Sequence, residues 1–240
     1  MNFKTKKITL GLIIVCIVSL STYAVMNKKS SVTNTQNTNL TTDVNKKEFK
    51  IVAFGDSLTA GLDVNLKDSY PSLLQTILNN NPEYKNYNLT FTVINMGVSG
   101  ESSSGGLARV DFVLEQKPNL VLMGLGANDM LRNTDPAFTL SNIDSIVQKI
   151  VSSQTPLVLL GIQSVASNGP DYKKDFDSIY PSIAKKYNLP LVPFFLAGVV
   201  QEPNLNNADG IHPNKSGYEK IVNENILPIL NPVLKDILDL

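Results

Sequence analysis

The chain has little of what disulfide frameworks and zinc sites require. Its 240 residues include no tryptophan, one cysteine (Cys16) and one histidine (His212). A single cysteine excludes an intramolecular disulfide, and zinc sites in proteins need several histidine or cysteine ligands. We therefore expect neither a disulfide nor a metal, and no motif of the sequence indicates a cofactor.

A net charge is also absent, because 21 basic side chains balance 21 acidic ones. The balance is uneven along the chain, since residues 1–48 contain seven lysines against two acidic residues, and the remainder contains 14 basic and 19 acidic side chains. A mildly acidic folded part argues against nucleic acid as a partner.

Charge is missing altogether from residues 8–25, which follow three lysines within residues 1–7. A helix of that length spans about 27 Å, close to the hydrocarbon core of a bilayer. Residues 1–26 are therefore predicted to be a signal peptide, cut after Ala24, or a retained membrane anchor. Lipidation at Cys16 is a third alternative. Each alternative places the rest of the chain outside the cytoplasm, in the periplasm or at the cell surface.

Large apolar side chains are scarce in residues 27–48, which are mostly Asn, Thr, Ser, Lys and Gln. Such a segment cannot bury enough surface to offset the entropy of ordering it. We expect a flexible linker there, followed by one folded domain at residues 49–240.

Short apolar runs alternate with helical periodicity throughout residues 49–240. Strands are expected at residues 50–54, 89–95, 120–125, 157–162 and 191–194. Apolar residues at helical spacing predict helices near residues 70–78, 105–116, 143–150 and 176–184, with a last helix from about residue 214. This alternation predicts parallel βαβ units, and therefore an α/β domain whose parallel sheet is covered by helices on both faces.

The most informative stretch is residues 51–61, where four apolar residues run directly into Gly55, Asp56 and Ser57. An apolar run without polar alternation indicates a buried strand, and the residues after Ser57 suit the start of a helix. Ser57 is thus expected at the carboxyl end of a strand, beside helix N–H groups that favour negative charge. Ligands of α/β folds bind at this edge of the sheet.

Three other segments contain an unusual density of Gly, Ser, Asn and Asp. They are residues 95–102, 124–129 and 209–213. The first two directly follow expected strands and the third precedes the last helix, so all three can converge on the edge of the sheet that carries Ser57.

His212 is the one candidate base for a serine hydroxyl in this chain. A lone histidine is more often a structural residue than a catalytic one, but Asp209 lies three residues earlier and Gly210 permits a turn between them. The carboxylate could then accept a hydrogen bond from one ring nitrogen, and the other nitrogen would face outward as a base.

Asn128 and Gly100 each have two interpretations. The Asn128 amide could donate to an oxyanion together with the backbone N–H groups of Ser57 and Gly100, or it could only cap a turn. Gly100 could equally be a turn residue with a positive φ. We interpret two neighbouring carboxylates, Asp56 and Asp129, as structural groups that cap a helix or brace the loops.

Four segments together resemble the motif blocks of the SGNH (GDSL) hydrolase family. They are residues 55–58 (Gly-Asp-Ser-Leu), Gly100, residues 126–129 (Gly-Ala-Asn-Asp) and residues 209–212 (Asp-Gly-Ile-His). The resemblance covers nearly all of residues 49–230. It implies a flavodoxin-like, three-layer α/β/α domain with a five-stranded parallel sheet.

The resemblance also implies roles for the residues of the motifs. Ser57 is then the nucleophile, His212 the base and Asp209 the partner that orients it. The oxyanion donors are then Ser57, Gly100 and Asn128. The implied activity is that of a serine esterase on acyl esters, of the lysophospholipase, arylesterase or thioesterase kind, acting on a small-molecule or lipid substrate.

Two alternatives to a lipid esterase remain at this point. The family also admits O-acetyl deacetylases that act on cell-wall or other polysaccharides, and a non-catalytic lipid- or glycan-binding module could use the same fold. The chain departs from the family pattern at Ala127 and at residues 162–169. We therefore infer no acyl-chain preference from the resemblance.

Overall fold

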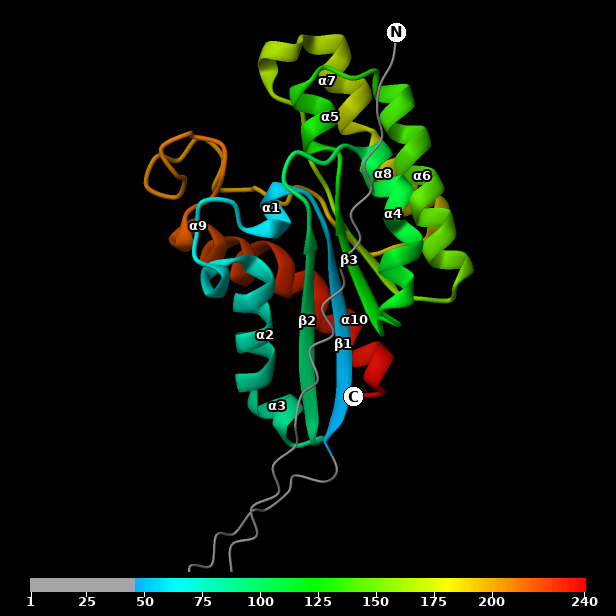
Figure 1. Cartoon of the computed structure of the whole chain (residues 1–240), viewed down its shortest axis with the longest axis vertical. Coiled ribbons are helices and arrows are strands. Elements are labelled where there is room, and N and C mark those ends of the chain that lie inside the picture. The colour runs from blue at the N-terminus through cyan, green and yellow to red at the C-terminus, as the bar shows by residue number, and fades with distance from the viewer. Residues whose placement is uncertain (1–45) are drawn as a thin grey trace, which may run out of the picture. The chain divides into compact units, whose positions relative to one another are not determined.

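The computed structural model describes residues 46–240 and contains one five-stranded sheet in which every strand is parallel to its neighbours. The strand order is β2-β1-β3-β4-β5 (Figure 1). The strands are β1 (Lys47–Gly55), β2 (Leu89–Gly97), β3 (Leu120–Gly124), β4 (Leu157–Leu160) and β5 (Leu191–Val192). The prediction of an α/β fold with a five-stranded parallel sheet is confirmed.

Helices cover both faces of this sheet. Their bounds are α1 (Ser57–Ala60), α2 (Tyr70–Asn80), α3 (Pro82–Lys85), α4 (Ser103–Glu115), α5 (Ala127–Leu131), α6 (Pro136–Ser152), α7 (Pro170–Asp177), α8 (Ile179–Tyr187), α9 (Lys215–Lys220) and α10 (Leu227–Leu238). Short 3₁₀ helices lie at Leu66–Asp68 and Ala166–Asn168, and a π-helix at Ile221–Ile226 joins α9 to α10. In Figure 1, α2 and α9 lie on one side of the strands and α4, α6 and α8 on the other.

The strands are apolar because both faces of the sheet are buried. In β1 the residues from Ile51 to Phe54 are fully buried, and all four residues of β4 are buried. Strands covered on both faces show continuous apolar runs, without the alternation of half-exposed strands. The apolar run of β1 therefore suits a central position in the sheet. The residues that follow it lie at the carboxyl edge of the sheet.

Three strands end level with one another at this edge. Gly55 at the end of β1 is paired with Gly97 of β2 on one side and with Gly124 of β3 on the other. The loops after β1, β2 and β3 consequently leave the sheet side by side, as the sequence predicts for Ser57, Gly100 and Asn128.

Several elements differ from the expected ones: β4 ends at Leu160, two residues early, and the last helix is divided by the π-helix into α9 and α10. The helix expected near residues 176–184 is two helices, α7 and α8, separated at Ser178. Pro181 explains the break, because its missing N–H cannot donate to the carbonyl of Asp177 and its ring would clash there. The last strand is also shorter than expected, since β5 contains only Leu191 and Val192.

The expectations for the N-terminus fall mostly outside the described residues. This holds for the signal peptide or anchor at residues 1–26 and for all but the end of the linker at residues 27–48. The first strand begins at Lys47, two residues before the expected start of the domain. Within residues 46–240, no helix combines the length and the apolar character needed to cross a bilayer.

Candidate active site

Ser57 is the first residue of α1, and Asp56 alone separates it from the end of β1. Asp56 caps this helix, because its Oδ1 accepts a hydrogen bond from the backbone N–H of Leu58 at 3.0 Å. The interpretation of Asp56 as a helix cap is confirmed. Ser57 is only 8% exposed, and its backbone N–H has no intrahelical acceptor because it is at the first helical position.

The side chain of His212 lies against that of Ser57, although 155 residues separate them in the chain. Its Nε2 is 2.8 Å from the Ser57 Oγ, and its Nδ1 is 2.5 Å from Oδ2 of Asp209. When Nδ1 carries the proton and donates to the carboxylate, Nε2 presents a lone pair to the serine hydroxyl. The structure thus brings together the three side chains that the sequence suggested.

Asp209 is held in this position by the turn that follows it. Its Oδ1 accepts from the backbone N–H groups of Ile211 at 2.9 Å and of His212 at 3.0 Å, and Gly210 supplies a φ of +69°. Desolvation opposes ionisation of this carboxyl, but the hydrogen bonds from the side chain and backbone of His212 and from Ile211 lower the pKa of Asp209 to about 2. It is therefore a carboxylate at neutral pH and can stabilise an adjacent imidazolium.

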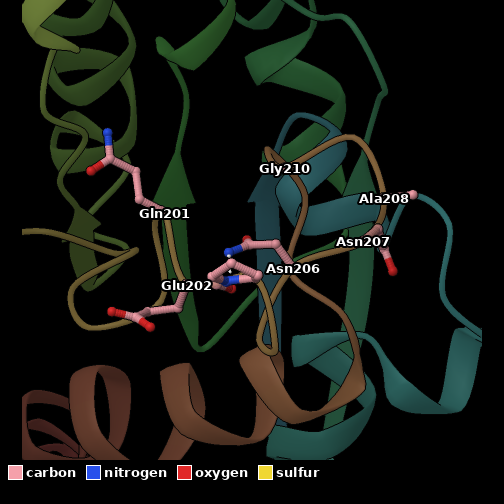
Figure 2. A pocket seen from close by; sticks show the side chains of 7 residues that line it. Gln201, Glu202, Asn206, Asn207, Ala208 and Gly210 are labelled. Carbon is pink, nitrogen blue, oxygen red and sulfur yellow. Dashed lines mark hydrogen bonds between the residues drawn. The ribbon is translucent and has the colours of Figure 1, made fainter.

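The loop that precedes Asp209 is held by the side chain of Asn206 and by a backbone hydrogen bond of Asn207. Figure 2 shows the Asn206 side chain turned into the loop, where its Nδ2 donates to the carbonyls of Val199 at 2.7 Å and Glu202 at 2.8 Å. The backbone N–H of Asn207 donates to the carbonyl of His212 at 2.8 Å. These bonds tie both ends of the turn that contains Asp209 and His212.

Two further candidate donors, Gly100 and Asn128, follow β2 and β3, the strands that end level with β1. Gly100 lies in the loop after β2 with a φ of +79°, and its backbone N–H donates no hydrogen bond to another residue of 46–240. Asn128 lies in α5, and its Nδ2 is 3.5 Å from Oδ2 of Asp56. The second hydrogen of this amide stays free for another acceptor.

Asp129 ties two of these segments together. Its carboxylate accepts from the backbone N–H of Ser103 at 2.7 Å and from the Ser103 hydroxyl at 2.6 Å. Asn142 of α6 in turn donates to that hydroxyl at 3.0 Å. The loop-bracing interpretation of Asp129 is confirmed, and the brace joins α5 to the start of α4.

An apolar cavity of about 200 Å³ opens beside Ser57 and His212. Its other lining residues are Leu58, Ala127, Asn128, Met130, Leu131, Ile162, Gln163, Val165, Phe194, Leu196, Val200, Gln201, Gly210 and Ile211. Three of them, Leu131, Val200 and Ile211, are exposed apolar side chains. The lining includes positions at which the chain departs from the family pattern, namely Ala127, Ile162, Gln163 and Val165. The resemblance therefore does not predict which acyl group this cavity binds.

Burial dominates the electrostatics of Asp56. Its side chain is almost fully inaccessible, and desolvation raises its pKa to about 7 despite the hydrogen bond from Leu58 and the nearby His212, which lower it. The usual value for this carboxyl is 3.8. Between these two pH values the unfolded chain releases the proton and the folded chain retains it.

We expect Asp56→Asn to change how stability depends on pH. In the wild-type protein, the raised pKa of Asp56 lowers the free energy of unfolding by up to about 4 kcal/mol as the pH rises from about 4 to 7. Asparagine does not titrate and so escapes this loss. As the pH rises over that interval, the variant should therefore become more stable relative to wild type. Urea unfolding at several pH values measures this. Asp111→Asn, at an exposed carboxylate of α4, is the control, and parallel curves for Asp56→Asn and wild type would contradict the shift.

No group of three or more His, Cys, Asp or Glu side chains within residues 46–240 is placed to hold a metal ion. The side chains at the site are instead a hydroxyl, an imidazole, a carboxylate and a set of N–H donors beside an apolar cavity. This set can activate a serine and stabilise an oxyanion, which is what a serine hydrolase of esters requires.

Comparison with known proteins agrees with this class. The chain matches the model of the GDSL-like lipase/acylhydrolase family over residues 53–220. The chain therefore belongs to this family, as the four motif blocks indicate, and it is a carboxylic-ester hydrolase.

Several relatives are named esterases. The chain is 37% identical to esterase TesA of Pseudomonas aeruginosa, over 77% of this chain and 89% of the relative. It is 37% identical to an arylesterase of Vibrio mimicus, over 68% and 80% of the two chains. It is 33% identical to thioesterase 1/protease 1/lysophospholipase L1 of Escherichia coli, over 75% and 85%.

The fold is also that of solved members. The crystal structure of TesA superposes with a TM-score of 0.70 at 36% identity, covering 77% of this chain and 99% of that one. The esterase EstA of a Pseudoalteromonas species superposes with a TM-score of 0.69 at 30% identity, covering 78% and 98%.

Two arginines at this site were not singled out by the sequence. Arg109 of α4 donates to backbone carbonyls at the ends of β1 and β2, and Arg132, which follows α5, donates to the carbonyl of Gly100. Arg109 belongs to a run that matches the family, but the run gives it no role, and a lone arginine after a short helix has no distinctive signal. Only the folded loops show which carbonyls they reach.

Proposed function

We propose that the protein hydrolyses esters of medium-length acyl chains, with Ser57 as nucleophile, His212 as general base and Asp209 as the residue that orients and stabilises the histidine. The observation that carries this proposal is the apolar cavity that opens directly beside the hydrogen-bonded Ser57 and His212 pair.

In the acylation step the Ser57 Oγ attacks the ester carbonyl carbon while Nε2 of His212 takes the hydroxyl proton. The carbonyl oxygen becomes an oxyanion, and the imidazolium is stabilised by the Asp209 carboxylate at 2.5 Å. When the tetrahedral intermediate collapses, the bond to the alcohol oxygen breaks and His212 returns the proton to that oxygen. The products are an acyl-serine and a free alcohol.

The oxyanion is held by the backbone N–H groups of Ser57 and Gly100 and by the Asn128 side chain. Support comes from the free N–H of Gly100 and from the position of Ser57 at the start of α1. Donors that are already fixed in place lose no energy to reorganisation when the charge develops.

Deacylation repeats these steps with water in place of serine. His212 removes a proton from a water molecule, the hydroxide attacks the acyl carbon, and the proton is returned to Ser57 as the carboxylic acid leaves. Relatives support this chemistry: EstA of Pseudoalteromonas is inhibited by monoethylphosphonate, a group of the kind that reacts with nucleophilic serines.

The cavity favours an acyl chain over an acetyl group. A methylene group is about the size of a water molecule, which has a share of roughly 30 Å³ in the liquid, so 200 Å³ accommodates about six to eight carbons. The names arylesterase and lysophospholipase among the relatives fit a site that accepts apolar acyl groups. An acetyl group would leave most of this cavity unfilled, which disfavours an O-acetyl deacetylase.

The test is the chain-length profile of the purified protein on p-nitrophenyl esters, with an acetylated glycan included. Each methylene that enters the cavity contributes about 0.8 kcal/mol, so kcat/KM is expected to rise roughly fourfold per carbon up to hexanoyl or octanoyl and then level off. Highest activity on the acetylated glycan would contradict the proposal and favour the deacetylase.

Val165→Phe is expected to shorten this profile, because the larger side chain fills part of the cavity that Val165 lines. We expect kcat/KM for octanoyl ester to fall about tenfold or more, with hydrolysis of the acetyl ester unchanged within about twofold. Val151→Phe, on the exposed surface of α6, is the matched control. An equal loss on both esters would show that Val165 does not limit chain length.

We also propose that the catalytic domain works outside the cytoplasm, in the periplasm or at the cell surface. The support is the lysine-preceded apolar run at residues 8–25. Fractionation of cells that express the full chain tests this, and activity confined to the cytoplasmic fraction would contradict it.

A further inference from the structure

The proposed oxyanion donors come from three separate segments of the chain. Ser57 begins α1, Gly100 lies in the loop after β2, and Asn128 lies in α5. A donor contributes only when it lies within hydrogen-bonding distance of the developing oxyanion, so the three segments need fixed relative positions. Two arginine side chains cross between these segments.

Arg109 links the first segment to the second. Its Nη2 donates to the carbonyl of Gly55 at 3.1 Å and to that of Met96 at 2.8 Å, at the ends of β1 and β2. Its Nε donates to Glu101 at 2.7 Å, and Nη2 pairs with the same carboxylate. Glu101 directly follows Gly100, and its side chain is only 7% exposed.

The guanidinium of Arg109 is also stacked on the core. Its Cζ lies 4.6 Å from the centre of the Phe54 ring, which limits where the charged group can move. The planar fork therefore reaches the carboxylate and both carbonyls, with the two hydrogens of Nη2 shared among three acceptors. A lysine ammonium lacks this geometry.

Arg132 links the second segment to the third. It is an exposed residue that follows Leu131, the last residue of α5, and its Nη2 donates to the carbonyl of Gly100 at 2.9 Å. This hydrogen bond connects α5, the helix that carries Asn128, to Gly100, whose N–H is a proposed oxyanion donor.

We propose that Arg109 and Arg132 are positioning residues of the oxyanion hole. Arg109 sets the Gly100 loop against the Gly55–Ser57 turn, and Arg132 sets the same loop against α5. Neither guanidinium touches the reacting atoms in this role. The proposal rests on the proposed function, because it presupposes that Gly100 and Asn128 donate to the oxyanion.

The size of the effect is bounded by what a whole donor contributes. Removing one oxyanion donor costs about 10²–10³ in kcat, so displacing one must cost less. We expect Arg132→Ala to lower kcat about 5–20-fold and Arg109→Lys about 30–100-fold, because Arg109 reaches three acceptors. KM should change by less than about twofold, since the interaction is made chiefly in the transition state.

The experiment compares wild type, Arg132→Ala, Arg132→Lys and Arg109→Lys, with two inhibitors of p-nitrophenyl butyrate hydrolysis. A trifluoromethyl ketone forms a tetrahedral oxyanion adduct, whereas butyrate, the product, forms none. The proposal expects the Ki of the ketone to rise by the same factor as kcat falls, with the Ki of butyrate unchanged. Arg132→Lys should recover part of the loss.

Lys50→Ala is the matched control, because Lys50 also donates to a backbone carbonyl, that of Gln116, but lies away from the carboxyl ends of the strands. The proposal is overturned if Arg132→Ala keeps kcat within twofold of wild type, or if kcat falls while the Ki of the ketone does not rise. Arg132 is exposed, so this arm does not depend on whether Arg109→Lys folds. Full turnover by Ser57→Ala would instead overturn the proposed function itself.

Discussion

Ser57→Ala is expected to lower kcat for p-nitrophenyl butyrate by about 10⁴-fold or more, with no loss of folding. The hydroxyl is the only group of the site that can form the acyl intermediate in our mechanism, and its hydrogen bond in the structure is to His212. Alanine removes one oxygen atom from a small side chain at the start of α1, where the Asp56 cap to Leu58 stays in place.

Initial rates and thermal unfolding of the two proteins measure both parts of this expectation. Ser145→Ala, on α6, is the control, since its hydroxyl makes only a local bond to the carbonyl of Ser141. That variant should keep wild-type rates. Turnover by Ser57→Ala within about tenfold of wild type would remove Ser57 from the mechanism.

His212→Ala is expected to cause a loss of similar size, about 10⁴-fold or more in kcat. Without the imidazole nothing takes the proton from the serine, and the Asp209 carboxylate loses the ring that it orients. The two side chains act as one unit, so their effects should not add.

The double variant Ser57→Ala/His212→Ala tests this coupling. Its residual rate should equal that of either single variant within about tenfold, because both already lack the same step. Losses that multiply would mean that the two residues act independently. The chain has no other histidine to replace His212 as a base.

The sheet and the edge that carries Ser57 could be predicted because their signals are local. A continuous apolar run identifies a buried parallel strand, and Ser57 follows such a run in β1. The pairing of His212 with Asp209 was also accessible, since three residues and a glycine turn set their geometry. Their contact with Ser57 followed from the rule that loops after parallel strands share one edge.

Packing details could not be predicted in the same way. The break between α7 and α8 depends on Pro181, whose effect competes with a helical pattern that continues on both sides. The π-helix at Ile221–Ile226 lies within a continuous helical pattern of apolar residues that does not distinguish it from an α-helix. The length of β5 depends on its pairing with β4, which includes only Leu191 and Val192, and such pairing is not visible in the local sequence.

The braces of the site and the shape of its cavity also required the structure. Arg109 and Arg132 reach carbonyls that are 54 and 32 residues away in the chain, and backbone carbonyls carry no sequence identity. The cavity is formed by side chains from several loops, including residues 162–165, which depart from the family pattern. Substrate preference therefore depends on the part of the chain that the motifs describe least.

The most direct test of the central claim is the mass of the protein after reaction with an ethyl p-nitrophenyl alkylphosphonate. The account predicts one covalent phosphonyl group per chain, on the peptide that contains Ser57, with loss of p-nitrophenol and of esterase activity in equal proportion. Ser57→Ala should remain unmodified. An adduct on another residue, or full inhibition without an adduct on Ser57, would contradict the assignment of Ser57 as the nucleophile.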